Sequence, residues 1–144
     1  MQLQIRPYDE SDEDAVIALW KGCGLTRPWN DPRKDIARKL AVQREWFLVG
    51  TLEGRVVASV MAGYEGHRGW VNYLAVAPGA RMRGAGRALM AEVERLLLAA
   101  GCPKINLQIR SDNAAVIEFY RRLGYGNDEV VSFGKRLVED EPRA

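Results

Sequence analysis

The segment between residues 70 and 110 constrains the fold more than any other part of the chain. The apolar run from Trp70 to Val76 predicts a β-strand, which Pro78-Gly79 ends. Apolar residues then recur at helical spacing over 84–100, and alternating apolar residues over 104–110 predict a second strand. Two strands joined by such a helix lie parallel with a right-handed crossover, so this segment predicts an α/β unit.

Apolar runs before residue 70 predict an antiparallel half of the same sheet. Glu53-Gly54 separates two of these runs as a hairpin turn. Two helices come earlier in the chain: Asp12 is expected to cap the first, and Asp31-Pro32 is expected to begin the second, over 32–44. The strands of this half are expected at 2–7, 46–49 and 55–61.

The chain after residue 110 completes the expected domain. Ser111 or Asp112 is suited to cap a short helix ending near Leu123-Gly124, and residues 130–137 are strand-like. Residues 139–144 are expected to be a frayed end. The prediction is one domain, 1–144, of α/β class, with a mixed, mostly antiparallel sheet of six to seven strands and helices on both faces.

Composition excludes several classes of function. The net charge of +2 is too small to indicate nucleic-acid binding, and no apolar run or leader predicts a membrane span, so a cytoplasmic location is expected. Cys23, Cys102 and His67 are too few to hold zinc, and no other metal site is expected. Both cysteines are predicted to be reduced and structural.

Glycines and arginines gather where the helix over 84–100 begins. The first amides of a helix lack partners within it and carry partial positive charge, so an anion is stabilised there. Gly84 and Gly86 allow the backbone to approach phosphate oxygens, and the arginines add charge. We therefore predict a diphosphate site. Its residues are Arg81, Met82, Arg83, Gly84, Ala85, Gly86 and Arg87.

Two other phosphate motifs do not fit this turn. Gly79 and Gly84 have the spacing of a P-loop, but Ala85-Gly86 stands where Lys-Ser/Thr is required. A dinucleotide fingerprint fails because Leu89 stands at its third glycine position. The remaining alternative is a glycine-rich turn that only starts a helix.

At this point the chain resembles the GNAT superfamily of N-acyltransferases. The family signature, Gln/Arg-x-x-Gly-x-Gly/Ala, matches Arg81 to Gly86, and the preceding Val-x-Pro is Val76-Ala77-Pro78. A later family element, Asn followed by a helix, Tyr and Leu-Gly-Tyr, matches Asn113 to Tyr125. Several loops, including Arg27 to Pro32, are similar to the small bacterial YpeA-type branch. The resemblance implies the GNAT fold.

The resemblance also implies a donor and its binding residues. Acetyl-CoA would be the co-substrate, with its pyrophosphate on the amides of the 82–87 turn and with Asn113 beside its pantetheine arm. The arm would pair with the strand residues Leu74, Ala75 and Val76. Tyr120, two helical turns after Asn113, would protonate the departing thiolate. For Tyr120 the alternative is a core anchor, and for Asn113 it is a helix cap.

The general base and the acceptor pocket are less well defined. Some relatives carry a glutamate at the position of Gln108, which cannot take a proton; Glu65, His67, Asp31 or a water relay are left as candidates. The acceptor would be a primary amine of a small molecule or peptide, attacking directly in a ternary complex. Its pocket is predicted to include Trp29, Asn30, Tyr64 and Tyr73, with ordinary packing as the alternative.

A second functional class follows from the same residues. A non-catalytic acyl-CoA-binding regulatory module would tolerate Gln108, whereas the presence of Tyr120 favours catalysis. An exposed edge on the C-terminal strand would also permit a homodimer.

Overall fold

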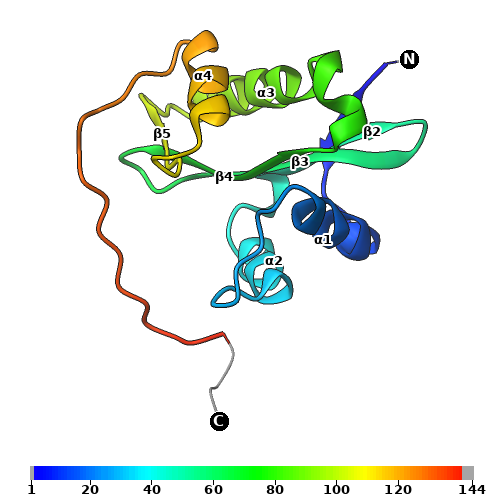
Figure 1. Ribbon diagram of the computed structural model, residues 1–144, viewed down its shortest axis with the longest axis horizontal. Coiled ribbons are helices and arrows are strands. Elements are labelled where there is room, and N and C mark those ends of the chain that lie inside the picture. The colour runs from blue at the N-terminus through cyan, green and yellow to red at the C-terminus, as the bar shows by residue number, and fades with distance from the viewer. Residues whose placement is uncertain (1, 141–144) are drawn as a thin grey trace.

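The structure, a computed structural model, describes residues 2–140, apart from the side chains of Met82 and Arg83. Figure 1 shows a central sheet with the C-terminal segment running outside it as an arm. The strands are β1 (Gln4–Pro7), β2 (Phe47–Leu52), β3 (Arg55–Tyr64), β4 (Gly69–Val76) and β5 (Ile105–Leu107), and the helices are α1 (Glu13–Gly22), α2 (Pro32–Leu40), α3 (Ala85–Ala99) and α4 (Ala114–Arg122).

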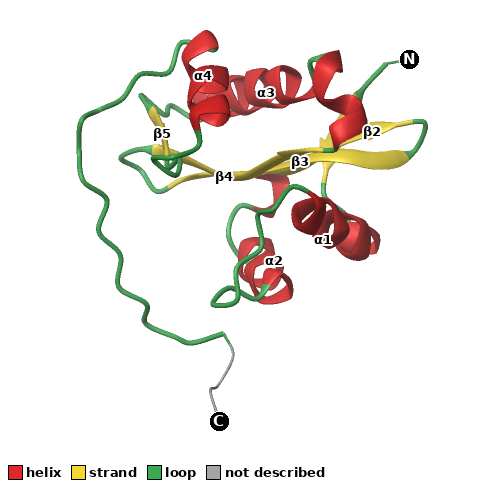
Figure 2. Ribbon diagram, viewed as in Figure 1, coloured by secondary structure: helices red, strands yellow, loops and turns green. Residues whose placement is uncertain are grey.

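The sheet is mixed, as predicted. Its order is β1-β2-β3-β4-β5, with antiparallel pairs from β1 to β4 and a parallel pair between β4 and β5. Helix α3 provides the crossover between the two parallel strands. Figure 2 shows α1 and α2 on one face of the sheet and α3 and α4 on the other, which confirms an α/β fold with helices on both faces.

Each face of the sheet has its own apolar core, because alternate strand residues point to opposite sides. On one side Val60 and Val71 pack with α3 residues such as Leu89 and Met90. On the other side Trp20 of α1 is fully buried, and its indole nitrogen donates a 2.9 Å hydrogen bond to Ser59 Oγ. The sheet is therefore covered on both faces, which leaves its two edges and the ends of its strands for a site.

A β-bulge interrupts β4 at the point where the strand leaves β5. The pairing with β3 shifts between Ser59↔Ala75 and Met61↔Asn72, so β4 carries one extra residue. Tyr73 has a φ of 54°, which is uncommon for a residue with a side chain. As a result Val71 and Tyr73 contribute to opposite cores. Such bulges bend a strand and are often found beside active sites.

The predicted C-terminal strand is not formed, so the expectation of six to seven strands is corrected to five. Residues 126–140 form the extended arm and make no backbone–backbone hydrogen bond within the described chain. The predicted frayed end is also wrong at Asp140. This residue is buried and accepts a 2.7 Å hydrogen bond from the Asp31 amide at the start of α2. Residues 141–144 lie outside the described part.

Several helices and strands begin or end at other residues than predicted, and local hydrogen bonds explain the differences at the helix starts. Asn113, rather than Ser111 or Asp112, caps α4 by accepting a 3.2 Å hydrogen bond from the Val116 amide. Asp12 does not cap α1 through its side chain, because that carboxylate forms an ion pair with Arg6. The predicted helix over 32–44 ends at Leu40, and the predicted strand over 104–110 is only Ile105–Leu107.

Candidate active site

Strands β4 and β5 form a fork. They are paired only from Gly69↔Ile105 to Val71↔Leu107, although β4 continues to Val76. The bulge at Tyr73 directly follows the last pair. Beyond the Val71↔Leu107 pair, β4 residues 72–76 have no strand partner on the β5 side within the described chain. An edge of this kind can pair with an extended ligand that carries amides.

The glycine-rich turn connects the end of this edge to α3. Pro78–Arg83 form a 3₁₀ turn, and Gly84, with a φ of 74°, leads into the first turn of α3. Arg81 Nε donates a 3.0 Å hydrogen bond to the Val76 carbonyl, so the turn is tied to the end of β4. Arg87 is exposed at the helix start. The predicted contributions of the Met82 and Arg83 side chains lie outside the described part.

The two glycines of the turn have different surroundings. A side chain at Gly84 would meet no atom within 4 Å, so this position is open to a ligand, and its positive φ favours glycine. Gly86 is buried, and a Cβ there would lie 3.0 Å from Phe119 Cζ. Close packing against Phe119 therefore explains why a glycine stands at position 86. The sequence-based prediction had explained Gly86 only by the approach of phosphate oxygens to the backbone.

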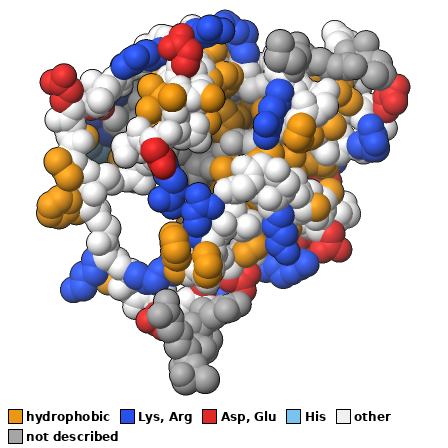
Figure 3. All heavy atoms as spheres, in the orientation of Figure 1, with side chains coloured by type: hydrophobic (Ala, Val, Ile, Leu, Met, Phe, Trp, Pro, Cys, Tyr) orange, Lys and Arg blue, Asp and Glu red, His pale blue; other side chains and the backbone are white. Residues whose placement is uncertain are grey.

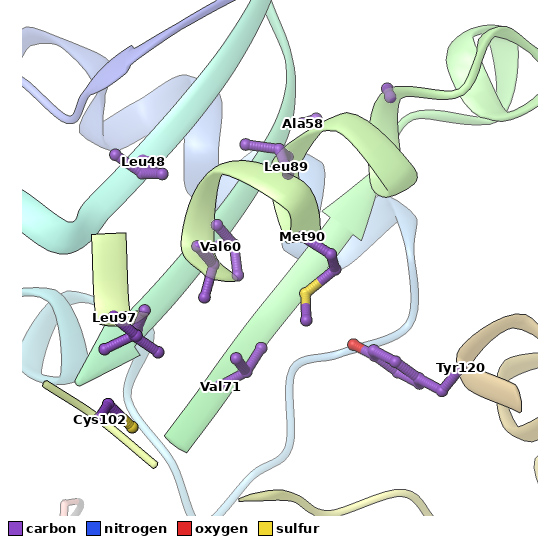
Figure 4. Close-up of a cluster of buried hydrophobic side chains, with 12 residues drawn as sticks. Leu48, Ala58, Val60, Val71, Leu89, Met90, Leu97, Cys102 and Tyr120 are labelled. Atoms are coloured by element: carbon purple, nitrogen blue, oxygen red, sulfur yellow. The ribbon is translucent and has the colours of Figure 1, made fainter. Parts of the chain in front are cut away.

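Tyr120 lies on α4 and is 7% exposed. Figure 4 shows its hydroxyl pointing from α4 toward β4, near Val71 and Met90. Phe119 and Tyr125 pack edge to face against its ring. Burial raises the pKa of the Tyr120 hydroxyl above its ordinary value of 10, so this group holds its proton at neutral pH. Both predicted roles, core anchor and proton donor, are compatible with this position.

An open cavity of about 780 Å³ lies at the α2 side of the fork. Gln108, which directly follows β5, lies at its wall together with Trp29 and Asn30 of the α1–α2 loop. The arm closes the other side. The full lining is Trp29, Asn30, Arg38, Gln108, Gly134, Lys135, Arg136, Leu137 and Val138. Two of the four residues predicted to bind the acceptor are thus together, with Gln108 beside them.

Tyr73 lies on the same face of the sheet, next to α2. Its ring stacks on Trp20 with centroids 3.8 Å apart, and its hydroxyl donates a 2.6 Å hydrogen bond to Asp35 Oδ2. Burial and the Asp35 carboxylate both raise the pKa of Tyr73. Asp35 was not among the residues predicted from the sequence, because a single aspartate on an amphipathic helix gives no signal until its neighbour is known.

The predicted base candidates Glu65 and His67 and the predicted pocket residue Tyr64 lie elsewhere. Tyr64 is the last residue of β3 and pairs with Gly69, and Glu65 and His67 lie in the turn beyond that pair. Gly69 is about 20 Å of extended chain from Ala75. Glu65 Oε1 accepts hydrogen bonds from the amides of His67 and Arg68, which lower the pKa of Glu65. The carboxylate thus closes the turn, and the lowered pKa makes it a weaker base.

The other chemical groups give no competing site in the described residues. Cys23 and Cys102 are free thiols. No cluster of His, Cys, Asp or Glu between residues 2 and 140 has the grouping of a metal site. No helix in that range is long and apolar enough to cross a membrane.

Comparison with known proteins agrees with this geometry. Residues 9–125 match the acetyltransferase (GNAT) family. Acetyltransferase YE1169 of Yersinia enterocolitica is 48% identical over 139 residues, covering 96% of this chain and 99% of that protein. The crystal structure of Ard1 from Thermoplasma volcanium has a TM-score of 0.78 at 25% identity, covering 86% of this chain and 82% of that one. PaiA N-acetyltransferase from Thermoplasma acidophilum, in complex with coenzyme A, shares the fold at 14% identity, with a TM-score of 0.80 and coverage of 91% and 94%.

The chain therefore belongs to the GNAT acetyltransferase family, and it is an acetyltransferase. This confirms the resemblance drawn from the Arg81–Gly86 and Asn113–Tyr125 motifs. Enzymes of this family use an acyl-CoA donor and amine acceptors.

Proposed function

We propose that this protein transfers the acetyl group of acetyl-CoA to a primary amine by direct attack in a ternary complex. The observation that carries the proposal is the fork. In the described chain the β5-facing edge of β4 has no strand partner from the bulge at Tyr73 to Val76, where the glycine-rich turn toward α3 follows, and the Tyr120 hydroxyl points toward β4. The pantetheine arm, which contains two amides, would pair with Leu74, Ala75 and Val76. The pyrophosphate would then reach the amides at the start of α3.

The proposed reaction needs a group that protonates the leaving sulfur and a group that stabilises the oxyanion. The amine nitrogen attacks the thioester carbonyl carbon, and a backbone amide near Ala75 or Val76 stabilises the oxyanion. The C–S bond then breaks, and Tyr120 protonates the leaving thiolate. The Asn113 side-chain oxygen accepts the capping hydrogen bond at the start of α4, so the proposed contact with pantetheine would use the side-chain nitrogen of Asn113.

The acceptor would enter from the cavity at Trp29, Asn30 and Gln108, opposite the α3 side. Asp35, which accepts a hydrogen bond from Tyr73 and forms a 3.2 Å ion pair with the cavity-lining Arg38, would attract the ammonium form of the amine. Gln108 cannot take the proton that the amine loses. Because the cavity is open, water carries this proton to solvent.

Thiol release measured with a thiol-reactive dye tests the proposal. Acetyl-CoA and a panel of primary amines, from polyamines and aminoglycosides to peptides with a free N-terminus, should give release that depends on the acceptor, with acetylated product found by mass spectrometry. A chain that binds CoA tightly but releases no thiol with any amine of the panel would contradict the proposal that the acceptor is a primary amine.

A further inference from the structure

The wall of the acceptor cavity is positively charged. Three cationic side chains line it: Arg38 of α2, and Lys135 and Arg136 of the arm. No acidic side chain of the described chain, residues 2–140, belongs to the lining. Figure 3 shows Lys and Arg side chains, in blue, at the rim of an opening between the arm and the body of the molecule. A concave surface with this charge attracts an anion.

The two arginines of the wall are held in place by neighbouring groups. Asp140, which is buried, forms ion pairs with Arg38 at 2.5 Å and with Arg136 at 3.7 Å. Arg136 Nη1 also donates a 2.9 Å hydrogen bond to the Val138 carbonyl, and its Nη2 donates one to Asn30 Oδ1. Within residues 2–140 these contacts leave Nε of Arg136 unused. The guanidinium groups are therefore in position before a ligand arrives, which lowers the cost of binding.

Lys135 differs from the two arginines. Its side chain is exposed at the cavity wall and makes no ion pair or hydrogen bond with another residue of the described range. Its charge is thus not balanced by a carboxylate in that part of the chain. The ammonium group of Lys135 and the unused Nε of Arg136 together supply donors for the two oxygens of a carboxylate.

The opposite charge lies on the β4 side of Arg38. Asp35 Oδ1 is 3.2 Å from Arg38 Nη1, and Asp35 Oδ2 accepts the 2.6 Å hydrogen bond from the Tyr73 hydroxyl. Tyr73 is the bulge residue at which the fork opens. From the fork outward, a negative group is therefore followed by the positive wall of the cavity. A molecule with its ammonium group at Asp35 would extend its other end toward positive charge.

We propose that the amine acceptor also carries a carboxylate, which Lys135 and Arg136 bind while the ammonium group lies toward Asp35. The proposal rests on the proposed acetyl transfer and names its substrate class, small amines of the amino-acid type. Polyamines and aminoglycosides would be disfavoured, because their further positive charges would meet the same wall. Trp29, which is 49% exposed in the cavity wall, would contact the carbon chain between the two charged groups.

Steady-state kinetics with matched acceptors tests the proposal. Glycine, β-alanine, γ-aminobutyrate and ε-aminocaproate vary the distance between amine and carboxylate, and their carboxamides remove the charge. For the best of these acids, kcat/KM should exceed that of its amide by roughly tenfold or more, the scale of one charged hydrogen bond. Lys135→Gln should lower kcat/KM for the acid alone. Lys21→Gln is the matched control, because Lys21 is exposed at the end of α1 and does not line the cavity.

A titration with glutarate, which has carboxylates but no amine, separates this proposal from the proposed function. Followed by heteronuclear NMR at constant ionic strength, glutarate should shift the Trp29 indole resonance, and Lys135→Gln should raise its Kd by roughly tenfold. Such binding without acetylation of any amine would contradict acetyl transfer but support the anion site.

Three results would overturn the anion site and leave acetyl transfer standing. The first is equal kcat/KM for acids and their amides. The second is glutarate binding that is absent, or that Lys135→Gln leaves unchanged. The third is a wild type that acetylates polyamines or aminoglycosides but none of the four acids. Melting temperatures of both lysine variants check that the domain is folded.

Discussion

Gly86 in the first turn of α3 lies against the ring of Phe119 on α4, where an added Cβ would come within 3.0 Å of Phe119 Cζ. The ring of Phe119 in turn packs edge to face on Tyr120, with centroids 5.1 Å apart. One close contact therefore sets the spacing between the helix start proposed to hold the pyrophosphate and the hydroxyl proposed to protonate the thiolate.

Gly86→Ala should disturb this spacing. We expect the variant to lose about 1–3 kcal/mol of unfolding free energy, because the methyl group overpacks a buried contact. Its KM for acetyl-CoA should also rise. Gly79→Ala, where a side chain meets nothing within 4 Å, is the control and should change neither value. Denaturant unfolding measures the free energy and steady-state kinetics measure the KM. If Gly86→Ala and Gly79→Ala have the same unfolding free energy and the same KM for acetyl-CoA, the contact with Phe119 does not set this spacing.

Tyr120→Phe should lower kcat by about 10²–10³-fold while leaving the melting temperature nearly unchanged. The hydroxyl has no hydrogen-bond partner among the described residues, so its removal costs little stability, whereas a general acid is lost. Tyr125→Phe is the matched control: its hydroxyl donates to Glu94 Oε2 at 2.7 Å, and its kcat should remain close to wild type. A Tyr120→Phe enzyme with full kcat would leave Tyr120 as a core anchor only.

Asp35→Asn should raise the KM for the amine by about tenfold and leave the KM for acetyl-CoA unchanged, because an opposite charge near the ammonium is removed. Tyr73→Phe should have a smaller effect in the same direction, since it removes only the 2.6 Å hydrogen bond to the carboxylate. Asp14→Asn, which affects an exposed ion pair with Arg33, is the control. A rise in both KM values for Asp35→Asn would indicate a general distortion.

Asp140→Asn should release the end of the arm from α2. The Arg38 guanidinium and the Asp31 amide lower the pKa of Asp140 from 3.8 to about 2. Because the folded-state pKa is the lower one, the stabilisation is complete above pH 3.8 and is lost as the pH falls through 2. The melting temperature of the wild type should thus exceed that of Asp140→Asn at neutral pH, and the difference should shrink as the pH falls from 3.8 toward 2. A difference that does not change with pH would argue against the ionised carboxylate.

Local signals gave most of the fold correctly. The apolar run at 70–76, the break at Pro78-Gly79 and the helical spacing after Gly84 predicted the parallel crossover, because these depend on residues close together in the chain. The arm at 130–137 was predicted as a strand because its residues are strand-like. Such residues favour an extended backbone. A strand also needs the edge of a neighbouring strand to pair with, and the sequence does not show whether such an edge lies next to the segment.

The residue types of the donor side were determined by the sequence alone: the glycine turn at a helix start, the arginines beside it, and Asn113 and Tyr120 two turns apart. Only the tertiary structure decided where the fork opens, because the bulge at Tyr73 arises from the mismatch of β4 against β3, not from a local motif. Tertiary packing likewise brought Asp35 to Tyr73 and Gly86 to Phe119, and it kept Glu65 and His67 in a distant hairpin. Contacts between residues far apart in the chain depend on how helices and strands pack against one another. The sequence indicates which face of each helix or strand is apolar, but it does not show which residues of two packed faces come into contact.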